Sequence, residues 1–86
     1  MLIKVMAEGE SLRIEDREIT LKSIRDGNSA EFAAEDGEAF IVSGTAATEV
    51  FPDVFVHAHN KGQFSTTRFR IAIDAPPRIR IGEAPG

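Results

Sequence analysis

The feature that most constrains this chain is a recurring pattern of short segments in which apolar and polar side chains alternate. These segments recur about every 8–12 residues, with turn-forming residues between them, as at 25–29 and 60–62. The clearest alternation covers residues 68–74, and signals for a helix are nearly absent. Because side chains alternate between the two faces of a strand, we predict an all-β fold, a small antiparallel sheet or barrel of about six to seven strands.

Two local signals refine this prediction. Asp36-Gly37 stands between short apolar runs at 30–34 and 39–42. This pattern is typical of a hairpin with a type I′ turn, which needs positive φ at both central residues. Pro52 interrupts another apolar run, and proline cannot donate to a sheet ladder, so we expect an edge position or a break there.

The chain is short, with 86 residues and no cysteine. One domain over residues 1–86 is expected, with a small core that an oligomeric interface would support. Disulfides, thiolate metal sites and cysteine-based catalysis are excluded. The first six residues are too short and too soon charged for a signal peptide, and no apolar run is long enough to span a bilayer. We therefore expect a cytoplasmic protein with no membrane association.

Two blocks of the sequence resemble the carbon storage regulator (CsrA/RsmA) family, bacterial RNA-binding regulators of translation. The first block is the opening of the chain, and the second is the strand pattern near its end. The matching residues are Met1-Leu2-Ile3, Gly9-Glu10-Ser11-Leu12, Ile14, Asp16, Ile19-Thr20-Leu21 and Phe69-Arg70-Ile71-Ala72-Ile73-Asp74-Ala75-Pro76.

The resemblance implies a post-transcriptional regulator that binds RNA as a homodimer, with the first and last strands paired across the two subunits. Several positions depart from the family. Residues 26–66 form a candidate insertion, and the C-terminal helix of the family is missing. Met6 and Ala7 stand where the family has its basic pair, and Glu83 stands where an arginine is expected. The resemblance thus covers the frame without the RNA contacts of the family.

Charge is unevenly distributed along the chain. Residues 1–40 carry five basic and ten acidic side chains, whereas residues 41–86 carry five and four, within a net charge of −4. An acidic total counts against nucleic-acid binding. The alternative is a protein-binding module or inhibitor, such as one encoded by a phage, whose acidic region 8–38 engages a basic partner through Glu8, Glu10, Glu15 and Glu18. A structural subunit of a larger assembly is a third possibility.

Four arginines are the sharpest feature of the C-terminal part. If residues 68–74 and 78–82 formed a hairpin with Ile71 opposite Ile81, Phe69 and the isoleucines would share the buried face. The opposite face would then carry Arg68, Arg70, Arg78 and Arg80. Such a face suits phosphate or an RNA backbone. The alternative is a solvated face that pairs with the acidic side chains of the N-terminal part.

His57 and His59 form a His-x-His pair on one face of a predicted strand, and Asp53 has the same parity. The pair is a weak candidate for a metal site because most such sites need a third protein ligand. Two half-exposed polar side chains are the simpler interpretation. The serines lack the setting of a nucleophile elbow, so we expect no enzyme activity and no cofactor. The phenylalanines, all six of the aromatic residues, are expected mainly in the core, including Phe32, Phe40, Phe69 and either Phe51 or Phe55.

Overall fold

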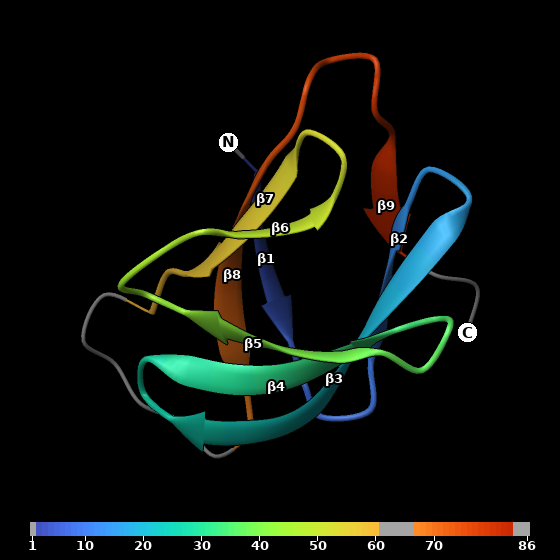
Figure 1. Ribbon diagram of the computed structural model, residues 1–86. Coiled ribbons are helices and arrows are strands. Elements are labelled where there is room, and N and C mark those ends of the chain that lie inside the picture. The colour runs from blue at the N-terminus through green and yellow to red at the C-terminus, as the bar shows by residue number, and fades with distance from the viewer. Residues whose placement is uncertain (1, 61–66, 84–86) are drawn as a thin grey trace.

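The computed structural model describes residues 2–60 and 67–83, and over these residues the protein is all-β. The predicted all-β class is confirmed, but the described residues form nine strands in two antiparallel sheets, more than the predicted six to seven strands of a single sheet or barrel (Figure 1). The strands are β1 (Leu2–Met6), β2 (Ser11–Ile14), β3 (Arg17–Asp26), β4 (Ser29–Ala34), β5 (Ala39–Ser43), β6 (Thr48–Phe51), β7 (Val54–Ala58), β8 (Phe69–Asp74) and β9 (Ile81–Glu83). The described residues contain no helix that is long and apolar enough to cross a membrane.

The four-stranded sheet has the order β1-β8-β7-β6, and the five-stranded sheet has the order β5-β4-β3-β2-β9. Strands β4 and β5 run across the lower end of the four-stranded sheet in Figure 1. The candidate insertion, residues 26–66, supplies β4 and β5 to one sheet and β6 and β7 to the other. This segment is therefore part of the framework of both sheets, and its residues 61–66 lie outside the described residues.

The predicted hairpin around Asp36-Gly37 is confirmed as the connection of β4 to β5, but the predicted type I′ turn is wrong. Gly37 has a φ of +90°, whereas Asp36 does not have a positive φ. The Gly37 N–H donates to Ala34 O at 2.9 Å, and the Asp36 carboxylate accepts from Glu38 N at 2.9 Å. This is a type I turn followed by a left-handed glycine, which accommodates one more residue than the two-residue loop.

The core lies between the sheets and is apolar. Strict alternation in β8 and β7 directs Phe69, Ile71 and Ile73 inward, where they meet Val54 and Val56. Phe32 contacts Phe69 edge to face at 6.4 Å between ring centroids, and stacks on Phe40 at 5.9 Å. The expected core positions of Phe32 and Phe69 are thus confirmed, with Phe40 and Phe51 packed at the margin. Phe55 points outward instead.

The predicted hairpin between residues 68–74 and 78–82 is wrong. Strand β8 pairs with β1 and β7, whereas β9 pairs with β2 in the other sheet. Residues 75–80 carry the chain from one sheet to the other, with a turn in which Ile79 N donates to Pro76 O at 2.9 Å. Local alternation identifies a strand but does not select its partner.

Candidate functional site

The four arginines predicted to form one face are divided between two places. Arg68 and Arg70 lie at the start of β8, and Arg70 is half-buried. Arg78 and Arg80 lie in the connection after the other end of that strand, where the Arg78 guanidinium pairs with Asp53 at 3.1 Å. The six residues of β8 span about 17 Å, so the continuous arginine face predicted from the hairpin does not form.

The acidic side chains proposed for a partner have contacts inside the chain. Glu8 accepts from Ile24 N at 2.8 Å, Glu15 accepts from Arg80 N at 3.0 Å, and Glu10 accepts from Ala7 N. Glu18 lies 3.9 Å from Arg13. These carboxylates hold turns and strand ends together, so part of the acidic charge of the N-terminal half has a structural role.

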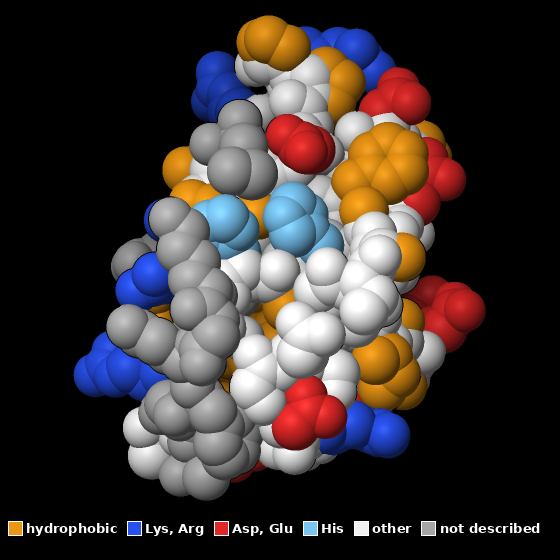
Figure 2. Space-filling model, turned by 90° about the vertical axis from the view of Figure 1, so that its left-hand side faces the viewer, with side chains coloured by type: hydrophobic (Ala, Val, Ile, Leu, Met, Phe, Trp, Pro, Cys, Tyr) orange, Lys and Arg blue, Asp and Glu red, His pale blue; other side chains and the backbone are white. Residues whose placement is uncertain are grey.

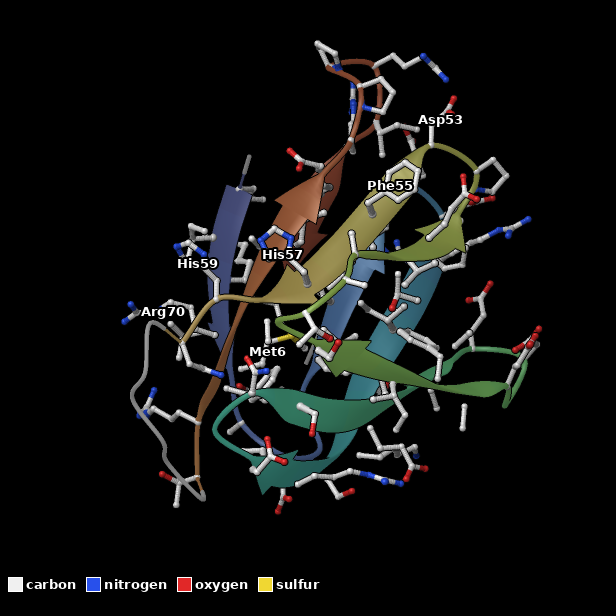
Figure 3. The ribbon with its side chains drawn as sticks, turned by 60° about the vertical axis from the view of Figure 1, so that its left-hand side comes forward. Met6, Asp53, Phe55, His57, His59 and Arg70 are labelled. Carbon is white, nitrogen blue, oxygen red and sulfur yellow. The ribbon has the colours of Figure 1, made fainter. Side chains whose placement is uncertain are left out.

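The outer face of the four-stranded sheet brings together residues that are distant in sequence. Phe55, His57 and His59 follow one another along this face of β7, and Arg70 lies on the neighbouring strand β8 (Figure 3). On the other side of β8, Ile3 is opposite Ala72 and Val5 is opposite Arg70. Figure 2 shows the two imidazoles side by side on this face, close to apolar side chains.

The histidines keep the geometry predicted for a His-x-His pair, with ring centroids 6.0 Å apart. His59 follows the last residue of β7, but its N–H still donates to Arg70 O at 2.9 Å, so the ladder continues through it. Asp53 is engaged by Arg78 at the turn before β7. Within the described parts of the chain, no three histidine, aspartate or glutamate side chains are grouped to hold a metal ion.

Among the described residues, β1 is an edge strand, and no strand pairs with the outward backbone groups of Ile3 and Val5. The backbone of Arg70 faces β7, because Arg70 O accepts from His59 N and Arg70 N donates to the Asn60 side chain at 2.8 Å. Successive residues of a strand direct their N–H and C=O groups to opposite sides. Alternate residues of β8 therefore face β1, and by the register of the two strands Ile3 and Val5 face away from β8.

This open edge is apolar. Of the five large hydrophobic side chains that are exposed in the described chain, three belong to β1: Leu2 at 39%, Ile3 at 38% and Val5 at 47%. The strand ends where Ala7 N is engaged by Glu10. Because soluble proteins usually protect edge strands with charge, proline or a bulge, an apolar open edge of this kind is a candidate binding site.

A groove of about 310 Å³ lies at one end of β1. Leu2 and Ile73 line it from the four-stranded sheet, and the connection between the sheets lines the rest with Ala75, Pro76, Pro77, Ile79 and Ile81. Leu2 is opposite Ile73, so it lies on the inner side of β1. The groove therefore continues from β1 toward the second sheet.

A second groove, of about 460 Å³, lies where β7 leaves the sheet. Asn60 lines it, and its Nδ2 donates to Gly27 O at 3.0 Å while its Oδ1 accepts from Arg70 N. Gly44 also lines it, and a Cβ at this position would displace the Asn28 carboxamide. The hydrogen bonds of Asn60 join the two sheets, and we assign this groove a structural role.

Comparison of the chain with protein-family models, with curated proteins and with solved structures returns no match. The resemblance to the carbon storage regulator family stays a prediction. A signal for the β1 edge is present in the sequence. Apolar side chains occupy both parities of residues 2–6 around a single lysine, whereas a strand with one solvated face would alternate.

Proposed function

We propose that this protein is a binding module that captures an extended segment of another protein by strand addition to β1. The observation that carries the proposal is the coincidence of open backbone groups and exposed apolar side chains at Ile3 and Val5. In strand addition, the main chain of the partner supplies hydrogen bonds and alternate side chains supply specificity. Strand β1 offers both backbone groups for such hydrogen bonds and exposed side chains for such contacts.

The side chains around β1 indicate what the partner segment carries. Lys4 is half-buried on the inner side of the strand. An acidic residue opposite Lys4 would form a favourable cross-strand pair. A second side chain of the partner, two residues from the acidic one and on the same face, would lie opposite Leu2. If it is apolar, it can enter the 310 Å³ groove. The partner is thus an extended segment with an acidic and an apolar residue separated by one position.

Pairing of β1 with β1 of a second copy is less favourable. The antiparallel register that uses the open groups of Ile3 and Val5 in both copies is centred on Lys4. Such a pair would place the two lysines directly opposite each other, where like charges are destabilising. We therefore propose a different protein as the partner, and treat the homodimer as an outcome of the test.

The proposal is tested with a synthetic peptide in which threonine occupies every second position. Isoleucine and glutamate alternate at the positions between the threonines, so that both lie on one face of the extended peptide. Addition of this peptide to the full chain should give saturable shifts of the amide resonances of residues 2–6 in NMR spectra. Val5→Pro removes an outward N–H and no hydrogen bond to β8, so it should abolish these shifts. Phe55→Ala, which changes an exposed apolar side chain away from the edge, is the matched control and should bind normally.

Three results would contradict the proposal. They are absence of shifts at β1, unchanged binding by Val5→Pro, and equal binding of a peptide with lysine in place of glutamate. A dimeric mass in light scattering that Val5→Pro converts to a monomer would instead support self-pairing.

RNA binding is a second candidate because of the outer face of β7. Phe55, His57 and His59 follow one another at every second position, and Arg70 lies beside them. Aromatic rings and arginine are the groups on which unpaired bases stack. A gel shift with structured RNA containing GGA, at low and moderate salt, tests this function. Salt-sensitive binding that Phe55→Ala weakens would support it, and absence of binding at low salt would contradict it.

A further inference from the structure

We propose that His57 and His59 form a two-histidine chelating site for a divalent transition-metal ion on the outer face of the four-stranded sheet. The chain contains no other histidine and no cysteine. Imidazole nitrogen is a preferred ligand of Zn²⁺, Ni²⁺ and Cu²⁺. The site goes beyond strand addition, and it stands or falls independently because it uses no group of β1.

The backbone holds both side chains on the same side of the sheet. His57 is opposite Ala72, and the His59 N–H donates to Arg70 O at 2.9 Å. Pairing with β8 thus fixes the extended conformation on both sides of Ala58. Because Ala58 is buried, His57 and His59 both point to the opposite, outer face. Both imidazoles are partly exposed and lie side by side in Figures 2 and 3. A metal ion can therefore reach them from solvent.

The ring separation is close to that of a chelate. Two imidazoles bound to one tetrahedral Zn²⁺ through nitrogens at about 2.0–2.1 Å have ring centroids about 5 Å apart. The observed separation is 6.0 Å, with the ring planes at 77°. Rotation of the two side chains closes this difference without movement of the strand. No aspartate or glutamate of the described chain is grouped with the two histidines as a third ligand, so water fills the remaining coordination positions.

Within β8, one basic and one acidic side chain lie on the face of the histidines. Alternation in β8 places Arg70 and Asp74 on the same side as the histidines, one on each side of Ala72. Their charges are opposite. Affinity therefore depends on chelation by the two imidazoles rather than on the field of the surface.

Titration of the full chain with Zn²⁺ in a calorimeter tests the site. We expect one Zn²⁺ per chain, and NMR should show shifts of the imidazole nitrogens of both histidines. Once one imidazole has bound Zn²⁺, the second binds the same ion within the molecule and strengthens the complex. His57→Ala and His59→Ala each remove this gain and should weaken Zn²⁺ binding about tenfold or more. Phe55→Ala, on the same face and strand, should leave the affinity unchanged.

The single variants distinguish chelation from two independent imidazoles. Independent sites would give two weak Zn²⁺ ions per chain, and each variant would lose one of them with no change in affinity for the other. That result, or absence of saturable Zn²⁺ binding by the folded chain, would overturn the proposal. Amide NMR spectra of the metal-free variants establish that they are folded, and binding retained by His57→Ala/His59→Ala would also exclude the site.

Discussion

Strands β1 and β6 are the two edges of the same sheet, and they are built differently. At β6 the register shifts between Glu49 and Phe51, and Pro52 follows directly. The Thr48 hydroxyl donates to Ile41 O of β5 at 3.1 Å, and the Arg17 guanidinium lies 5.1 Å from the centre of the Phe51 ring. Each of these features makes pairing with another strand harder.

At β1 the register against β8 is regular from Leu2 to Met6. Lys4 is the single charged residue of the strand, and the exposed side chains on both sides of it are aliphatic. The same sheet thus protects one edge with a bulge, a proline and contacts to the second sheet, and leaves the other edge open. This difference between the two edges supports the proposal that β1 binds a partner strand.

The largest expected effect comes from removing the support beneath β1. Phe69 is buried in β8 opposite Met6 and contacts Phe32. Phe69→Ala should lower the free energy of unfolding by about 3–5 kcal/mol, because it leaves a large cavity in the core. Urea unfolding followed by circular dichroism measures the loss.

Phe55→Ala is the matched control, since Phe55 is an exposed phenylalanine on the adjacent strand. Its substitution should change the free energy of unfolding by about 0.5 kcal/mol or less. Equal losses in the two variants would mean that the outer face of this sheet is packed and not available to a partner.

Asn60→Ala should have the next largest effect. This side chain joins the two sheets through Gly27 O and Arg70 N, away from both edges. Loss of two hydrogen bonds should lower the free energy of unfolding by about 1–3 kcal/mol. Asn60→Asp keeps the acceptor for Arg70 N and should lose less. If neither variant changes stability, the sheets are held together elsewhere, for example at the β5–β6 contact.

Thr48→Val should weaken the protected edge by a smaller amount. It removes the hydrogen bond to Ile41 O, which is worth about 0.5–1.5 kcal/mol. Hydrogen exchange should become faster for amides of β6 and stay unchanged for β1. Thr45→Val is the control, since the Thr45 hydroxyl contacts only the Ser43 side chain at 3.1 Å in the described chain. Faster exchange at β1 in Thr48→Val would show that the two edges are not independent.

The smallest effect on stability is expected at the open edge itself. Val5→Lys places a charge on an exposed strand position and should change the free energy of unfolding by about 0.5 kcal/mol or less. The same change should abolish capture of the isoleucine–glutamate peptide, because charged edges discourage strand addition. A loss of more than about 1 kcal/mol would mean that Val5 is packed in the folded protein.

Much of the fold was predictable from local patterns. The alternation in residues 68–74 correctly identified Phe69, Ile71 and Ile73 as core residues, and Asp36-Gly37 correctly marked a hairpin. The predicted turn type was wrong because Asp36-Gly37 also fits a loop that is one residue longer, in which only the glycine has a positive φ. The sequence did not decide whether Phe51 or Phe55 is a core residue. In the structure, Phe55 points outward because the inward positions of β7 are those of Val54 and Val56.

The candidate site was less predictable. The His57 and His59 pair depends only on spacing within a strand, and the structure preserves it. The arginine face depended on which strand pairs with β8, and that prediction was wrong. The open edge of β1 was missed, because an edge is defined by the absence of a neighbour on one side.

The sequence by itself therefore determined the strands, their inward faces and several turns, because a period of two and local turn chemistry act over a few residues. Only the tertiary structure decided that β8 lies between β1 and β7 and that β9 joins β2 in the other sheet. These pairings join segments far apart in the chain. Their selection depends on how the whole core packs, and the open edge of β1 follows from that selection.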